Sequence, residues 1–198
     1  MPAPFTALVG RAAERAELVE LLSDPLHRLV TLLGLGGAGK THLALAVAPE
    51  LALAFEHGAA FVPVGSLASA DNLAQAILQS LEVPLPGELD AGQVLVEYLR
   101  PRELLLILDS FEHLLPAAAV SDGPLPSAPA QLAALLEQAP RVTVLVTSRE
   151  RLAMRSEWVL TLSGLACPTA AEPFAPGGEP YAAVQLFMER AQDRKSVV

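Results

Sequence analysis

The residues best suited to chemistry form one glycine-rich segment, which follows the pattern G-x-x-x-x-G-K-[ST] of a Walker A phosphate-binding loop. Glycines allow backbone N–H groups to approach an anion, and a helix beginning after the loop directs its positive end at that anion. Lys40 would reach the β- and γ-phosphates, and the Thr41 hydroxyl would bind Mg²⁺. The segment therefore predicts a nucleotide site formed by Gly34, Gly36, Gly37, Ala38, Gly39, Lys40 and Thr41.

The segments on either side of this loop decide whether it can bind phosphate. Residues 29–33 are a short apolar run typical of a buried parallel strand, and residues 41–48 are mostly helix formers. A strand, a glycine loop and a helix in this order are what a phosphate site requires. The alternative is an ordinary glycine-rich turn between a strand and a helix, and the motif and its flanks together disfavour it.

A second apolar run, residues 104–108, ends in the carboxylate of Asp109. An acid at the carboxyl end of a buried parallel strand lies on the ligand side of an open α/β sheet. Mg²⁺ needs an acidic partner there, usually through water. We therefore expect Thr41 and Asp109 to form the metal site, the alternative being that Asp109 only caps the next turn.

A third strand is predicted at residues 142–146 and is followed by Thr147, Ser148 and Arg149. These residues should emerge at the same sheet edge as Asp109. An arginine there could sense the γ-phosphate and couple its presence to the shape of the domain. The spacing alone leaves a second interpretation open, in which Arg149 is a solvated residue that opens a helix.

The remaining sequence must supply the elements that position these residues. Pro49 should end or kink the helix after the loop, and Pro63 should place the strand 59–64 at the sheet edge. We expect Trp158 in the core and a flexible Pro/Ala-rich loop at about 116–129. Apolar periodicity and strand-like runs predict further helices at 11–22, 71–81, 91–99, 131–138 and 181–193, and a fifth strand at 158–162. Strands that alternate with helices predict an α/β fold, a parallel sheet between two helical layers.

Composition narrows the function classes. The chain has 198 residues, 52% of them hydrophobic, and a formal net charge of −9. These values exclude a mainly disordered chain, and the acidic balance argues against direct nucleic-acid binding, which needs a basic footprint. The single cysteine, Cys167, excludes a disulfide framework, and no apolar run is long enough to cross a membrane. We expect one cytoplasmic domain over residues 1–198.

Together these motifs resemble the STAND class of P-loop ATPases, and within it the NB-ARC-like signalling branch. The resemblance covers nearly the whole chain. The segments 106–114 and 147–150 are especially similar to the ATPase modules of large bacterial transcriptional regulators, including LuxR-type proteins. Further points of similarity are the segment 8–11, the glycine loop, and the tail at 183–191.

The resemblance implies roles and an architecture. Val9, Gly10 and Arg11 would contact the adenine side of ATP or ADP, Asp109 would serve Mg²⁺, and Arg149 would be the first sensor. The strand order, numbered along the chain, would be five, one, four, three, two, which agrees with an edge position for Pro63. Other domains or protomers would contact the C-terminal side. His42 follows the loop and could approach the nucleotide, although a surface role is the alternative.

Two departures from that class affect the expected activity. Many relatives carry a second acid after the first, but this chain has Ser110, and Glu112 is the nearest carboxylate that could activate water. The class also continues into a helical lid and a winged helix, which we expect to be missing here.

The leading interpretation is an ATP- and ADP-binding switch that hydrolyses ATP slowly. The alternatives are a non-hydrolysing nucleotide-binding module, a small-molecule kinase, and an inactive fragment. The kinase interpretation lacks an acceptor site and an arginine-bearing lid in the sequence. The other two alternatives remain open at this point.

Overall fold

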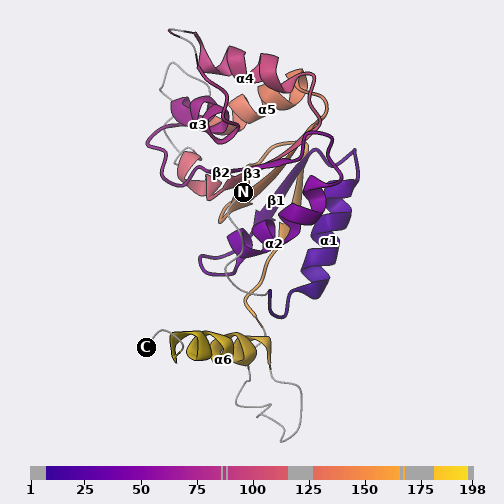
Figure 1. Cartoon of the computed structure of the whole chain (residues 1–198), viewed down its shortest axis with the longest axis vertical. Coiled ribbons are helices and arrows are strands. Elements are labelled where there is room, and N and C mark those ends of the chain that lie inside the picture. Colours follow the sequence, from indigo (N-terminus) through magenta and orange to yellow (C-terminus); the bar gives the residue numbers. More distant parts are fainter. Residues whose placement is uncertain are drawn as a thin grey trace, which may run out of the picture.

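A computed structural model describes residues 8–85, 87, 89–115, 127–165, 167 and 181–195. Figure 1 shows the arrangement of the helices and strands. The strands are β1 (Leu29–Leu33), β2 (Ala59–Pro63), β3 (Leu104–Asp109), β4 (Val142–Ser148) and β5 (Glu157–Thr161). The α-helices are α1 (Ala12–Ser23), α2 (Lys40–Ala52), α3 (Leu73–Ser80), α4 (Ala91–Leu99), α5 (Ala128–Gln138) and α6 (Ala182–Lys195). Short 3₁₀ turns, η1 (Ala70–Asn72) and η2 (Phe111–Leu114), precede α3 and follow β3.

The strands form one parallel sheet in the order β2-β3-β4-β1-β5. This is the predicted order, and β2 with its Pro63 lies at the edge as expected. Proline is tolerated there because it has no N–H to donate to a further strand. Strands β1 and β4 are neighbours in the sheet although they are far apart in the sequence, and the glycine loop follows β1.

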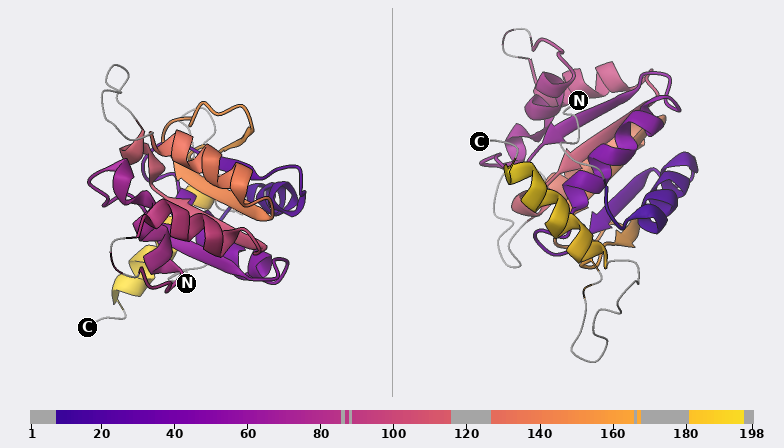
Figure 2. Two further views of the ribbon diagram at one scale, coloured as in Figure 1. Left: turned by 90° about the horizontal axis from the view of Figure 1, so that it is seen from above. Right: turned by 60° about the horizontal axis from the view of Figure 1, so that its bottom comes forward.

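Alternating residues of the strands face two separate cores, so the sheet lies between two helical layers, as Figures 1 and 2 show. Leu104, Leu106 and Leu108 of β3 pack in the core formed with α3, α4 and α5. Leu105 and Ile107 of the same strand pack in the core formed with α1 and α2. Burial on both faces explains why the central strands are continuous apolar runs.

Two local predictions were wrong, and a third was wrong in part. Pro49 does not end α2, which continues to Ala52, because it removes a hydrogen bond only in the last turn and Leu51 remains buried. The predicted alternative, a kink at Pro49, stays a prediction. Pro129 was expected in a loop that extends to about 129, but it lies in the first turn of α5, where its missing N–H costs nothing. Trp158 is 48% exposed and stacks at a tilt on His27, since β5 is an edge strand with one open side.

The rest of the predicted loop, residues 116–126, lies outside the described residues. Helix α6 lies apart from the two helical layers in Figure 1. The first residue of α6, Ala182, lies against Gly10. A Cβ added at Gly10 would lie 2.2 Å from the Cβ of Ala182. Within the described part of the chain, no helix is long and apolar enough to cross a membrane.

Candidate nucleotide-binding site

The glycine loop connects β1 to α2 at the carboxyl edge of the sheet. Gly37 and Gly39 have φ angles of +79° and +92°, which L-residues with side chains rarely adopt, and Gly39 is the N-cap of α2. The Gly34 N–H donates to the Ser148 carbonyl at 3.2 Å, which ties the start of the loop to the end of β4. The backbone thus takes the conformation that the motif predicts, and the N-terminus of α2 is directed at the loop.

Lys40 is the first residue of α2 and is buried. Its Nζ donates to the carbonyl oxygens of Gly34 and Leu35 at 2.8 and 3.0 Å, so the side chain folds back over the loop. Burial lowers the pKa of Lys40, Glu112 and Asp109 oppose that shift, and Arg149 adds to it. The loop therefore contains a desolvated cation, the kind of group that binds a phosphate strongly.

Three oxygen-bearing side chains meet at the end of β3. The Thr41 hydroxyl donates to Oδ1 of Asp109 at 2.7 Å, and the Thr147 hydroxyl donates to the same oxygen at 2.6 Å. The backbone N–H of Ser110 donates to Thr147 Oγ1 at 2.9 Å. Carboxylate and hydroxyl oxygens suit a hard cation such as Mg²⁺, so Thr41 and Asp109 could hold that ion.

Glu112 and Arg149 form an ion pair beside the loop. Glu112 Oε1 lies 3.0 Å from Arg149 Nε, and the two side chains are 12% and 58% exposed. A Cβ added at Gly36 would lie 3.3 Å from the guanidinium carbon of Arg149, so this arginine lies against the loop. The second oxygen of Glu112 is buried and accepts no hydrogen bond from a described residue.

Ser110 explains how Glu112 reaches this position. Its φ of +65° places it in the left-handed region, which turns the chain sharply after β3 and starts the short turn η2. Phe111 and Leu114 of that turn are buried in the core with α3, α4 and α5. Glu112 lies between these two anchors and is held near the loop.

A cavity of about 380 Å³ lies beside the loop. Part of its wall consists of Val9, Arg11, Gly37, Ala38, Gly39 and His42, and the rest includes Gly164, Leu165, Cys167, Ala183 and Leu186. The first group was predicted at the nucleotide site, whereas Gly10, which was predicted with it, does not line this cavity and faces Ala182. The second group was not predicted to belong to the site, because its members are part of no motif. They line the cavity only because the folded chain brings their segments beside the loop.

Arg11 connects the separate walls of this cavity. Its guanidinium donates to the carbonyls of Ala38 in the loop and Ser163 after β5, and it pairs with Glu14. The side chain is buried, so these contacts occupy most of its donors. Arg11 therefore shapes the cavity in this structure, in addition to lining it.

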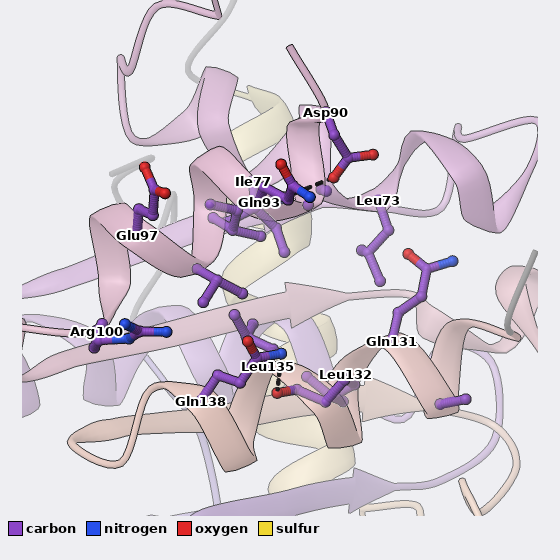
Figure 3. Close-up of a pocket in the computed structure, with 16 residues that line it drawn as sticks. Leu73, Ile77, Asp90, Gln93, Glu97, Arg100, Gln131, Leu132, Leu135 and Gln138 are labelled. Carbon is purple, nitrogen blue, oxygen red and sulfur yellow. Dashed lines mark hydrogen bonds between the residues drawn. The ribbon is translucent and has the colours of Figure 1, made fainter.

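A larger cavity, of about 610 Å³, lies away from the loop between α3, α4 and α5. Figure 3 shows its apolar side chains, among them Leu73, Leu132 and Leu135, beneath a rim of polar residues. No residue of the glycine loop lines it. The glycine loop and this cavity are thus separate features.

Among the described residues, no group of three or more His, Cys, Asp and Glu side chains is arranged to hold a metal ion. At a glycine loop that binds a nucleotide, a divalent cation also takes oxygen ligands from outside the protein. Phosphate oxygens and water are the usual ligands of Mg²⁺ in such sites.

The parallel sheet, its strand order and the loop between β1 and α2 define the class of P-loop nucleotide-binding domains. The profile of the NB-ARC domain family matches residues 12–113. The chain belongs to the NB-ARC family.

The chain also resembles mycobacterial proteins in sequence. The chain is 32% identical over 192 residues to "Uncharacterized protein Rv0894" of Mycobacterium tuberculosis, a match that covers 97% of the chain and 43% of that protein. It is 33% identical over 131 residues to "Putative HTH-type transcriptional regulator Rv0890c" of the same organism, covering 66% of the chain and 14% of that protein. The chain thus spans less than half the length of the curated relatives that it matches.

Solved structures share the fold. The ORC2 protein of Aeropyrum pernix, described with ADPNP and ADP, has a TM-score of 0.58 and 19% identity, covering 82% of this chain and 49% of that chain. Cdc6p from Pyrobaculum aerophilum has a TM-score of 0.61 and 19% identity, covering 80% of this chain and 46% of that one.

Proposed function

We propose that this chain is one nucleotide-binding domain that binds ATP and ADP with Mg²⁺ and acts as a switch with slow hydrolysis. The observation that carries the proposal is the hydrogen bond of 2.7 Å between Thr41 and Asp109. This hydrogen bond joins the glycine-loop motif to the apolar strand that ends in Asp109, through the atoms that would hold the metal. The cation of Lys40 on the same loop supplies the complementary charge for phosphate.

The residues present fit a Mg²⁺–nucleotide. A cavity of about 380 Å³ adjoins the loop and is within the size range of small-molecule sites. Bound Mg²⁺ would neutralise charge on the phosphates, and Thr41 and Asp109 would be its protein partners. Lys40 would orient the phosphates, and Val9, Arg11 and His42 would lie on the side of the base. Arg149 would bind the γ-phosphate, since its guanidinium already lies against Gly36.

Glu112 is the proposed general base. Its free oxygen Oε2 is buried near the loop and could accept a proton from an attacking water. Arg149 holds the other oxygen, so the carboxylate is oriented by the same residue that would contact the γ-phosphate. A non-hydrolysing module is the second candidate, because Ser110 occupies the position of the acid that many relatives carry.

The proposal also includes a regulatory role for this domain. One relative bears the name of an HTH-type transcriptional regulator and is much longer than this chain. We propose that the nucleotide state of this domain biases its contacts with other domains or protomers, and thereby a regulatory output. Helix α6 is the candidate route, since Ala183 and Leu186 line the same cavity as the loop and Phe187 is 74% exposed.

Calorimetry with ADP and ATP in Mg²⁺ tests the binding function. We expect saturable binding by the wild type and its loss in Lys40→Ala. The matched control is Arg155→Ala, because Arg155 is exposed and makes no ion pair or hydrogen bond with a described residue. Equal binding by the Lys40→Ala variant, or none by a folded wild type, would contradict the proposal.

Multiple-turnover phosphate release separates the two candidates. Hydrolysis by the proposed base predicts release that Glu112→Gln lowers by about 10²–10⁴-fold while ADP still binds. Release from the wild type that does not exceed the rate of Lys40→Ala would favour the non-hydrolysing module.

A further inference from the structure

Thr147 is buried at the carboxyl end of β4, next to the proposed metal site. The register of the sheet explains its position. Leu108 of β3 lies opposite Val146 of β4, so the following residues, Asp109 and Thr147, are neighbours across the two strands. Both side chains project to the face of the sheet that carries α2, because Leu105 and Ile107, at alternate positions before Asp109, pack there.

Both hydrogen-bonding functions of the Thr147 hydroxyl are in use. It donates its proton to Asp109 Oδ1 at 2.6 Å and accepts the backbone N–H of Ser110 at 2.9 Å. A hydroxyl has one proton to donate, so this arrangement fixes the rotation of the O–H bond. The hydroxyl therefore connects β4 both to the carboxylate and to the turn that follows it.

Asp109 Oδ1 receives two such hydroxyls, those of Thr41 and Thr147. Thr41, in α2, would also bind Mg²⁺. Thr147 lies on β4 and is not a proposed metal ligand. We propose that Thr147 is a positioning residue, which holds the Asp109 carboxylate in the orientation that the Mg²⁺–nucleotide requires. This inference rests on the proposed function.

The contact with Ser110 gives Thr147 a second target. Ser110 has a φ of +65° and starts the turn that brings Glu112 to the loop. A hydrogen bond to its N–H stabilises this turn at its first residue. Thr147 therefore positions the metal carboxylate directly and the proposed base through the backbone.

The sheet offers a matched control on the adjacent strand. Thr31 of β1 is as fully buried as Thr147, but its Oγ1 has no hydrogen-bond partner among the described residues. It lies opposite Val146 and is thus one position from Thr147 in the sheet. Thr31→Val and Thr147→Val make the same change in shape, and only the second removes hydrogen bonds to Asp109 and Ser110.

The experiment compares ADP affinity in EDTA and in excess Mg²⁺ for the wild type, Thr147→Val, Thr147→Ser and Thr31→Val. We expect Thr147→Val to bind ADP like the wild type in EDTA. The factor by which Mg²⁺ raises the affinity for ADP should be about 10–100-fold smaller in this variant, as for other residues that orient metal ligands. Thr147→Ser keeps the hydroxyl and should restore the enhancement. Thr31→Val should behave as the wild type.

A merely structural role for Thr147 would lower thermal stability and leave the ratio of affinities with and without Mg²⁺ unchanged, and this outcome would overturn the inference. If Thr147→Val does not fold, Thr147→Ser and Thr147→Cys provide the comparison, and equal Mg²⁺ enhancement in these two would also overturn it. Failure of the proposed function is distinguishable, because the wild type would then bind no nucleotide, or Lys40→Ala would bind it equally well.

Discussion

The Thr41 hydroxyl and Oδ1 of Asp109 are 2.7 Å apart although the two residues are separated by 68 positions in the sequence. Thr41 is in the first turn of α2, and Asp109 is the last residue of β3, with β4 between β3 and β1, the strand that leads into the loop. The fold of the protein itself thus brings the proposed metal ligands together. Such preorganisation lowers the cost of binding an ion at this position.

Asp109→Asn tests the role of this carboxylate. The amide has the same shape and removes the charge, so we expect ADP binding in EDTA to persist and the enhancement by Mg²⁺ to fall by at least about tenfold. Titration of ADP at several Mg²⁺ concentrations measures the change. The control is Asp71→Asn, an exposed acid at η1. A variant with the wild-type response to Mg²⁺ would exclude Asp109 as the metal partner.

Arg149→Ala tests the proposed contact with the γ-phosphate. We expect the affinity for ATP to fall more than the affinity for ADP, because only ATP carries the group that the guanidinium would bind. Calorimetry with both nucleotides gives the ratio, and Arg151→Ala, an exposed arginine two positions away, is the control. Thermal stability is measured alongside, because the substitution leaves the largely buried carboxylate of Glu112 without its ion-pair partner. Equal losses for ATP and ADP would assign Arg149 a general electrostatic role.

The sequence was sufficient to predict the elements that form this site. The loop motif, the apolar runs that become β1, β3 and β4, and the edge position of Pro63 each depend on local chemistry. The register of β3 and β4, which places Asp109 beside Thr147, could not be predicted, because both strands are buried on both faces and carry no alternating pattern. The strand order itself came from the family resemblance.

Contacts formed by irregular backbone could not be predicted. Ser110 adopts a positive φ without being glycine, and this turn is what places Glu112 on Arg149. Arg11 was expected at the adenine side, but its donors largely bind backbone carbonyls of distant segments. Trp158 was expected in the core, whereas it is 48% exposed on β5, which lies at the edge of the sheet.

Affinity for ADP should fall as the pH rises through the alkaline range. Burial lowers the pKa of Lys40 from its ordinary value of 10.5, so the free protein loses this proton at a lower pH than an exposed lysine does. Binding to phosphate requires the charged form, so the affinity should drop up to about tenfold per pH unit above the pKa of the free protein.

Calorimetry at several pH values up to 10 measures this slope. Lys40→Arg is the control, because arginine keeps its charge throughout this range and should give a flatter profile. An identical pH dependence in both proteins would show that another group causes the loss.

Arg28→Met should lower the stability of the fold and leave nucleotide binding unchanged. The partly buried guanidinium of Arg28 donates to the carbonyls of Leu136, Ala139 and Val142, and so joins the end of α5 to the start of β4. These carbonyls lie near the amino end of β4, which begins at Val142. The glycine loop lies at the other end of this strand, where the Gly34 N–H donates to the Ser148 carbonyl. Hydrogen bonds to a charged group contribute about 1.5–3 kcal/mol, and methionine keeps the apolar part of the contact. We therefore expect the free energy of unfolding in urea to fall by about 2 kcal/mol.

The control is Arg155→Met, at an exposed position, which should leave the free energy of unfolding unchanged. A stable Arg28→Met variant with weakened ADP binding would instead show that the amino and carboxyl ends of the strands are coupled.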